Sequence, residues 1–339
     1  NGIDGLKFSF MENELIDKMS ENYSHTTFKT DYLIKGEPYP FSLEYFEDEG
    51  WGEVRLGIAP IKKGLIEDAI SKAKSSELVI MVLGTYDYIE SEGRDRAETD
   101  LPLDQKNLLK KVYEVNQNLI LVLVNGSTIS LPWASKNIPA IVQAWHLGSK
   151  SGDAIAQVLY GDYNPSGKLT MSFPRNVGQV PIYYNYKNTG RPSTSIEQVT
   201  NSGYADVENS PLYSFGFGLS YTSFEYSDFK IDTNSMTKDS KINASIAVKN
   251  TGEYAGKEVV QLYLRDIVGS IARPMKELKG FEMIELKPGE TKTVTFEIDN
   301  SLLEFYSFNK VWESEPGKFH LFIGSSSDVK DYKEFYLKD

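Results

Sequence analysis

Residues 78–84 read LVIMVLG, an uninterrupted apolar run that ends on glycine. Such a run is typical of a parallel β-strand that is buried on both faces. The loop that follows, residues 89–96, reads IESEGRDR and sets charged side chains on both sides of a glycine. In open α/β sheets, sites form beyond the carboxyl ends of the strands. The sequence therefore predicts that any chemistry lies in this loop, where Glu90, Glu92 and Asp95 are candidate general acids.

The composition excludes several classes of site and partner. The 48 acidic side chains outnumber the 36 basic ones, and the net charge of −12 disfavours nucleic acid or an anionic membrane surface as partner. The chain has no cysteine, which excludes disulfides, thiolate metal sites and a cysteine nucleophile. His25, His146 and His320 lie far apart, which argues against a histidine-rich metal site. No apolar run reaches transmembrane length and no signal peptide opens the sequence. We expect a neutral ligand, no cofactor and no membrane insertion.

The sequence around the charged loop alternates between helix and strand patterns. Apolar residues in 65–73 recur at helical spacing, and a second helix is expected from 101–102, where proline stands near the first turn. Apolar runs at 119–124 and 140–145 predict two more strands, and residues 153–159 predict another helix. This order predicts a mostly parallel sheet with helices on its faces.

Both ends of the chain show the alternation of β-strands instead. Residues 1–60 are β-rich. Their clearest alternation is at 6–10, 41–45 and 54–58. From 223 to 339, about seven alternating segments are separated by turns, which predicts an antiparallel sandwich of immunoglobulin or fibronectin type III kind. Residues 160–222 are aromatic and turn-rich, and they predict a wrapped loop that its tyrosines order.

Several motifs follow one another along the chain. They are EGRDR at 92–96, LPLDQ at 101–105, GDYNPSGKLTMSFP at 161–174 and PLYSFGFGLSYT at 211–222. Together they resemble the acid/base loop and the C-terminal domain of glycoside hydrolase family 3 β-glucosidases. The segments ELKGF at 277–281 and LKPGET at 286–291 are similar to the fibronectin III-like domain of bacterial members. Residues 1–60 resemble the second half of a PA14 β-sandwich, a carbohydrate-associated module that some members carry inserted in this α/β domain.

The resemblance implies a fold class of α/β plus all-β. Residues 1–60 are then a partial PA14-like module, residues 61–222 the family's mostly parallel α/β domain, and residues 223–339 a fibronectin III-like β-sandwich. The start at Asn1 rather than methionine suggests a fragment or a processed product.

The resemblance also implies a mechanism. Family members are retaining enzymes that take an aspartate nucleophile from an N-terminal TIM barrel and a glutamate acid/base from this second domain. Carried over by motif, Glu92 is the acid/base, and no residue of this chain can be assigned as the nucleophile. We therefore expect the C-terminal portion of a periplasmic or extracellular exo-β-glucosidase, which acts on oligosaccharides or β-glucosides and is inactive without its barrel domain. Lys150 and Leu147 depart from the family pattern, which commonly has an acidic residue and a proline there.

The residues leave alternatives open within the site. Glu90 competes with Glu92 for the acid role, while Asp95 and Arg96 are expected to brace the loop by pairing with each other or with the sheet. Further positions fit either ligand contact or packing: Trp145, His146, Tyr183, Tyr184, Tyr186 and the turn at 190–192. The NGS at 125–127 suggests phosphate binding, but a phosphate cradle needs a fuller glycine pattern.

Alternatives also remain for the function. One is a β-xylosidase or another family 3 glycosidase. A second is a non-catalytic carbohydrate-binding assembly. A third, a nucleotide-binding flavodoxin-like module, lacks a supporting loop.

Overall fold

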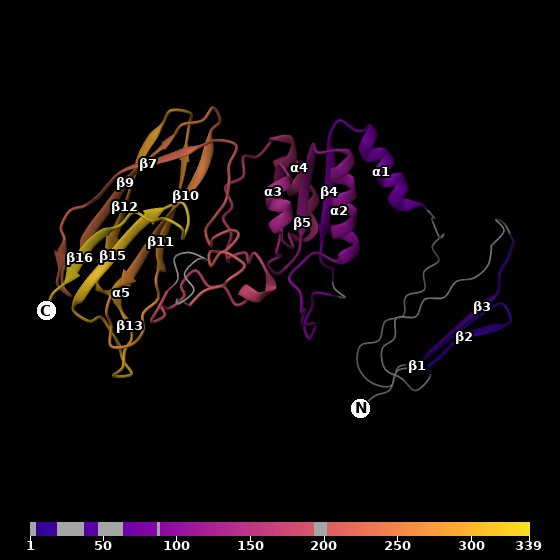
Figure 1. Cartoon of the computed structure of the whole chain (residues 1–339), viewed down its shortest axis with the longest axis horizontal. Helices are drawn as coiled ribbons and strands as arrows, with labels where there is room; N and C mark the ends of the chain where they lie inside the picture. Colours follow the sequence, from indigo (N-terminus) through magenta and orange to yellow (C-terminus); the bar gives the residue numbers. More distant parts are fainter. Residues whose placement is uncertain (1–4, 19–36, 47–63, 87–88, 193–201) are drawn as a thin grey trace. The chain divides into compact units, whose positions relative to one another are not determined.

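The computed structural model describes residues 5–18, 37–46, 64–86, 89–192 and 202–339 (Figure 1). The chain divides into two compact units, Asn1–Gly64 and Leu65–Asp339, and each unit is described by itself. None of the helices in the described ranges has the length and apolarity that a bilayer crossing requires.

The first unit contains a three-stranded antiparallel sheet in the order β2-β1-β3. Its strands are β1 Gly5–Phe10, β2 Asn13–Lys18 and β3 Phe41–Phe46. The alternation along β1 buries Phe8 and Phe10 on one face, where Phe10 stacks on Tyr39. The strands expected at 6–10 and 41–45 are confirmed, and 54–58 lies outside the described residues. The PA14 resemblance stays a prediction.

The second unit begins with a parallel sheet in the order β4-β5-β6, accompanied by helices (Figure 1). Its strands are β4 Val79–Gly84, β5 Leu119–Val124 and β6 Ala140–Gln143. Its helices are α1 Leu65–Ser75, α2 Leu103–Val115, α3 Pro132–Asn137 and α4 Ser151–Tyr160. The central strand β5 is the most buried, since Leu121 and Val122 have no exposed surface. The prediction of a mostly parallel α/β layer is confirmed.

Strand β4 is less buried than the apolar run predicts. Ile80 is 41% exposed and Val82 is 60% exposed, while Met81 on the opposite face is buried. Among the described strands β4 pairs only with β5, so it lies at an edge of the sheet, and the described residues leave its face with Ile80 and Val82 exposed. The prediction that this strand is buried on both faces is therefore wrong.

Gly84 fixes where the charged loop begins. The Gly84 N–H donates to the side-chain oxygen of Gln105 at 2.9 Å, and the Gln105 amide donates to the Gly84 carbonyl at 3.0 Å. A Cβ at Gly84 would lie 1.8 Å from the Val124 carbonyl oxygen, so only glycine lets β4 and β5 end this close together. Helix α2 and strand β5 thus hold the start of the loop.

The remainder of the second unit is a largely antiparallel β-sandwich. One sheet has the order β11-β10-β15-β16-β8 and the other β12-β9-β7. The strands are β7 Phe224–Ile231, β8 Ser235–Met236, β9 Ile242–Asn250, β10 Gly256–Asp266, β11 Glu277–Leu286, β12 Thr291–Ile298, β15 Gly317–Gly324 and β16 Lys333–Leu337. Helix α5 Asn300–Leu303 and the hairpin of β13 Phe305–Tyr306 and β14 Trp312–Glu313 complete it. Alternate residues such as Ile242, Ala244 and Leu262 fill the core between the sheets. The predicted sandwich is confirmed, with β8 as a short addition.

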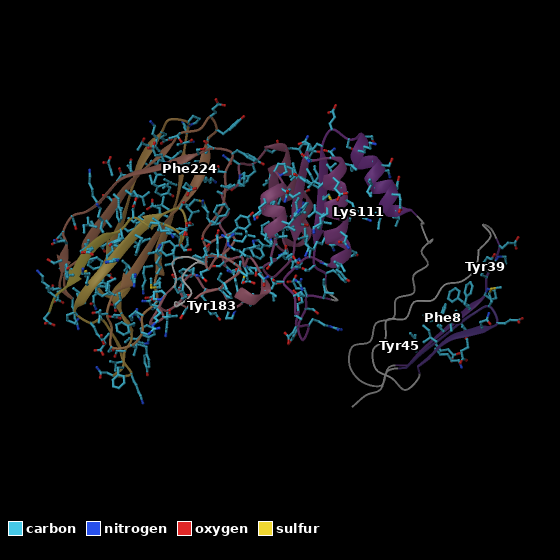
Figure 2. The ribbon with its side chains drawn as sticks, viewed as in Figure 1. Phe8, Tyr39, Tyr45, Lys111, Tyr183 and Phe224 are labelled. Atoms are coloured by element: carbon cyan, nitrogen blue, oxygen red, sulfur yellow. The ribbon has the colours of Figure 1, made fainter. Side chains whose placement is uncertain are left out.

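Aromatic rings and a buried ion pair order the segment between α4 and β7. Figure 2 labels Tyr183 of this segment and Phe224 at the start of β7. Tyr184 stacks on Phe215 with ring centroids 4.2 Å apart, as the tyrosine-rich composition predicts. Lys168 of this segment donates to both carboxylate oxygens of Glu258 on β10, at 3.1 and 3.0 Å. Tyr226 of β7 donates to the same carboxylate at 2.8 Å. The segment is therefore tied to the sandwich through Glu258.

Candidate active site

The loops that follow β4, β5 and β6 meet at the carboxyl edge of the parallel sheet, and Glu90 joins them. One carboxylate oxygen of Glu90 accepts from the Gly126 N–H at 2.8 Å, and the other accepts from the Ser127 N–H at 2.7 Å. The hydroxyls of Thr85 and Ser127 donate to the same carboxylate. The Glu90 side chain is only 16% exposed. The charged loop is therefore pinned to the loop after β5 at a point two residues before Glu92.

These contacts decide the ionisation of Glu90. Burial alone would raise its pKa, but hydrogen bonds from Ser127, Thr85 and Gly126 outweigh burial and lower the pKa to about 2. Donated hydrogen bonds stabilise the carboxylate form. A general acid must carry a proton near neutral pH, so this environment argues against Glu90 in that role.

The stability of the chain should therefore depend on pH through Glu90. Its folded pKa lies below the ordinary value of 4.5, so the stabilisation is present above pH 4.5 and is lost as the pH falls toward 2. We expect Glu90→Gln to lower the free energy of unfolding by about 3 kcal/mol near pH 7. Urea unfolding of both chains at pH 7 and pH 3 measures the difference. A difference that stays the same at pH 3 would contradict the assignment.

Glu92 lies in a different environment. It is exposed and occupies a turn that the Arg94 N–H closes by donating to the Ser91 carbonyl at 3.0 Å. Gly93 follows it at φ 71°, a conformation that a side chain disfavours. The geometry thus presents the Glu92 carboxylate at the tip of an anchored loop.

The end of β6 adds an aromatic residue and a histidine. Trp145 has φ 57°, which is unusual for so large a side chain, and its ring lies edge-on to Phe173 with centroids 5.9 Å apart. This turn ends β6 at Gln143, before the predicted end at 145. His146, the next residue, is 51% exposed, and its Nε2 lies 3.6 Å from the Glu90 carboxylate. Trp145 therefore packs against Phe173, and His146 lies beside Glu90.

Residues 125–127 bind an anion, but the anion is the protein's own carboxylate. The Gly126 and Ser127 N–H groups, considered for phosphate, both point at Glu90. The sequence does not assign Ser127 to the site, because Ser127 lies 37 residues from Glu90 and leaves no local pattern. Thr85 lies five residues before Glu90 but belongs to no recognisable motif. The only signal was the polar NGS at the end of an apolar strand.

Arg96 of the loop and Lys150 after β6 make local contacts. Arg96 donates to the Asp100 carbonyl, which braces the loop, and it does not pair with Asp95 within the described residues. Lys150 pairs with Asp153 at 3.2 Å on the surface. Neither contact brings a further charge to Glu92.

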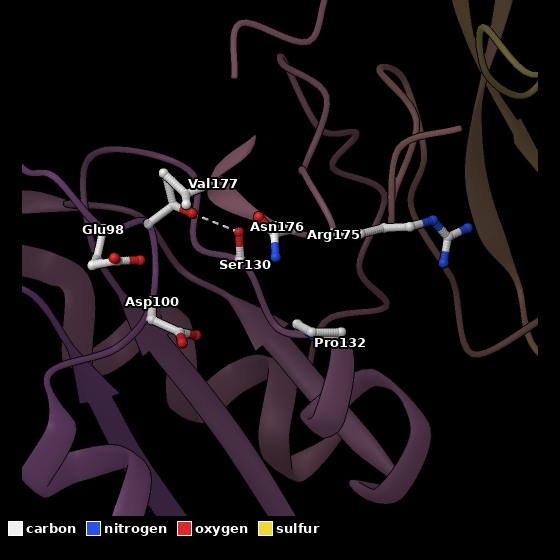
Figure 3. Close-up of a pocket in the computed structure, with 8 residues that line it drawn as sticks. Glu98, Asp100, Ser130, Pro132, Arg175, Asn176 and Val177 are labelled. Atoms are coloured by element: carbon white, nitrogen blue, oxygen red, sulfur yellow. Dashed lines mark hydrogen bonds between the residues drawn. The ribbon is translucent and has the colours of Figure 1, made fainter. Parts of the chain in front are cut away.

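A small cavity lies between residues 98–100, the start of α3 and residues 175–177 (Figure 3). Its volume is about 110 Å³, and its lining includes Glu98, Asp100 and Arg175. The Arg175 guanidinium forms an ion pair with the Glu208 carboxylate at 2.7 Å. Pockets for drug-sized ligands usually exceed about 300 Å³, so this cavity does not form a sugar site by itself.

Among the tyrosines considered for the cleft, Tyr184 packs against Phe215, whereas Tyr183 and Tyr186 are exposed.

Two family models match the chain. The glycosyl hydrolase family 3 C-terminal domain matches residues 6–221, and the fibronectin type III-like domain matches residues 258–327.

Curated relatives agree with these matches. A periplasmic β-glucosidase of Salmonella typhimurium is 44% identical over 266 residues, which are 78% of this chain and 35% of that protein. A β-xylosidase of Formosa agariphila is 42% identical over 280 residues, 81% of this chain and 37% of that protein. The chain thus spans about a third of the length of the curated relatives that it matches.

Solved structures show the same fold. A β-glucosidase of Listeria innocua in complex with glucose superposes with a TM-score of 0.77 and 34% identity, over 83% of this chain and 39% of that one. A β-glucosidase of Kluyveromyces marxianus in complex with glucose superposes with a TM-score of 0.75 and 31% identity, over 100% of this chain and 43% of that one. The family match covers more than half of the chain and agrees with the parallel sheet, the loop beyond β4 and the terminal sandwich, so the chain belongs to glycoside hydrolase family 3 and carries its C-terminal domain with a fibronectin III-like domain.

Proposed function

We propose that this chain is the part of a retaining exo-β-glucosidase that supplies the general acid/base, Glu92. The observation that carries the proposal is the contrast between two glutamates of one loop. Glu90 is locked as a carboxylate by four donated hydrogen bonds, whereas Glu92 is exposed at the loop tip, where a glycosidic oxygen can reach it.

A retaining glycosidase needs two carboxyl groups about 5 to 5.5 Å apart. In the first step the acid protonates the departing oxygen while the nucleophile attacks the anomeric carbon. In the second step the same group, now a carboxylate, takes a proton from water as the water attacks the glycosyl-enzyme. Glu92 serves as acid and then as base, and the aspartate nucleophile comes from a TIM barrel elsewhere in the same polypeptide.

The meeting of two domains also provides the electrostatics of the reaction. A second carboxylate close to the acid favours the protonated form of the acid near neutral pH. Arg96 is turned to the Asp100 carbonyl and so is engaged within the loop. The approach of the nucleophile's carboxylate is thus the feature of the proposal that favours a protonated acid.

The proposed substrate is terminal β-linked glucose on short oligosaccharides or β-glucosides. The β-glucosidases among the relatives and solved structures support this choice. The β-xylosidase of Formosa agariphila, at 42% identity, supports β-xylosides as the alternative. A periplasmic or extracellular location is proposed from the periplasmic relative.

The test compares the full-length polypeptide with residues 1–339 alone. We expect the full-length polypeptide to hydrolyse p-nitrophenyl β-glucoside faster than the β-xyloside, and we expect no turnover from the chain alone, because half of the carboxylate pair is absent. Release of p-nitrophenol measures both. Turnover by the chain alone would contradict the division of labour, and sugar binding without turnover by the full-length polypeptide would favour a non-catalytic carbohydrate-binding assembly.

A further inference from the structure

We propose that Glu90 is a positioning residue for the reaction: it anchors the charged loop to the loop after β5 and so fixes the location of the Glu92 carboxylate. This inference rests on the proposed function of Glu92.

The anchor is close enough to control Glu92. Two residues of chain reach at most about 7 Å, so fixing Glu90 confines the backbone of Glu92 to a small volume. The anchor is also built into the sheet. Thr85, whose hydroxyl donates to Glu90, is itself held by its N–H, which donates to the Val124 carbonyl at 3.0 Å. Gly126 and Ser127 follow β5, the most buried strand of the sheet.

The turn that carries Glu92 lies at the surface. Ser91, Glu92 and Gly93 are exposed, and the Arg94 N–H closes the turn by donating to the Ser91 carbonyl at 3.0 Å. Exposed turns with few buried contacts open at low free-energy cost. Glu90 enters this turn, and two contacts hold it: its N–H donates to the Tyr86 carbonyl at 3.0 Å, and its carboxylate accepts from the loop after β5. The carboxylate is thus the link between the turn and the sheet.

The hydrogen bonds of the Glu90 carboxylate also argue against direct contact between Glu90 and the substrate. Each of its oxygens receives one backbone N–H and one hydroxyl, so neither oxygen faces a reacting sugar with a free lone pair or a proton. The close neighbour of Gly126 is His146, since a Cβ at Gly126 would lie 3.2 Å from the His146 ring, whereas the Glu90 carboxyl carbon would be at an ordinary contact distance of 3.5 Å. Glu90 thus acts through Glu92 and not on the substrate.

The experiment uses the full-length polypeptide and two substrates that differ in their need for protonation. The leaving group of 2,4-dinitrophenyl β-glucoside departs as a phenolate without a proton. The leaving glycosidic oxygen of cellobiose requires one. We expect Glu90→Gln to lower kcat/KM for cellobiose by about 100-fold, the cost of misplacing a catalytic group by about 1 Å. The loss on the dinitrophenyl glucoside should stay below about 5-fold, because the nucleophile and the sugar site are intact.

Two further variants make the result decisive. Ser127→Ala removes one of the donors to the Glu90 carboxylate. This variant should lose less activity than Glu90→Gln, and again more on cellobiose than on the dinitrophenyl glucoside. It keeps the proposal testable even where Glu90→Gln fails to fold. Glu114→Gln, an exposed glutamate near the carboxyl end of α2, should leave the rates on both substrates unchanged.

Equal losses on both substrates, or no loss on cellobiose, would overturn the positioning role. Failure of the proposed function looks different: Glu92→Gln itself would then show no preference between the substrates, and both proposals would fall together.

Discussion

Glu92→Gln in the full-length polypeptide is expected to lower kcat/KM for cellobiose by about 10²- to 10⁴-fold, the usual contribution of a general acid. The same change should cost little on 2,4-dinitrophenyl β-glucoside, because that leaving group departs without a proton. Glutamine keeps the size and the hydrogen-bonding capacity of the side chain, so the loss reports the missing proton. Initial rates on both substrates across pH 4 to 8 measure it.

The pH profile gives a second readout. A general acid imposes a fall in kcat/KM at high pH, and Glu92→Gln should remove that fall while the low-pH limb remains. Glu114→Gln, which neutralises an exposed carboxylate near the carboxyl end of α2, is the control and should keep both limbs of the profile. Equal losses on the two substrates would show that Glu92 is not the proton donor.

The second large effect concerns stability. Glu258→Ala is expected to lower the free energy of unfolding by about 3 to 5 kcal/mol, because the change leaves a buried cation without its partner. Lys168 is 12% exposed and Glu258 is 4% exposed, so water cannot replace the lost contact. Burial, with the Glu258 charge beside it, raises the pKa of Tyr226, whose hydroxyl would also lose its acceptor.

Urea unfolding of the 339-residue chain measures this loss. The matched control is Asp68→Ala, which breaks a pair of similar length, 2.8 Å to Lys72, whose side chains are 57% and 74% exposed. Exposed pairs contribute little, so the unfolding midpoint of the control should barely move. Equal midpoints for Glu258→Ala and wild type would show that the ion pair does not hold the segment to the sandwich.

The sequence predicts the fold well where periodicity is local. The run at 119–124 is a buried strand because helices cover it, and the spacing at 65–73 is that of α1. The same reasoning fails at Ile80 and Val82, since an apolar run does not reveal whether a strand lies at an edge. Helix α3 was missed because six residues are too few to display a helical period.

The site was only partly predictable for a similar reason. The position of the loop after an apolar strand, together with the family motif, points to Glu92. The separate role of Glu90 depends on donors from Gly126 and Ser127, which only the parallel pairing of β4 and β5 brings near. An anion-binding pattern in the sequence says nothing about whether the anion is a ligand or the protein's own side chain.

The central claim is that Glu92 acts as acid/base opposite a nucleophile from another part of the polypeptide. Incubating full-length Glu92→Ala with 2,4-dinitrophenyl β-glucoside and sodium azide tests it most directly. The trapped glycosyl-enzyme lacks a base for water, so azide, which needs none, should accelerate turnover and yield β-glucosyl azide. No acceleration and no azide product would contradict the account.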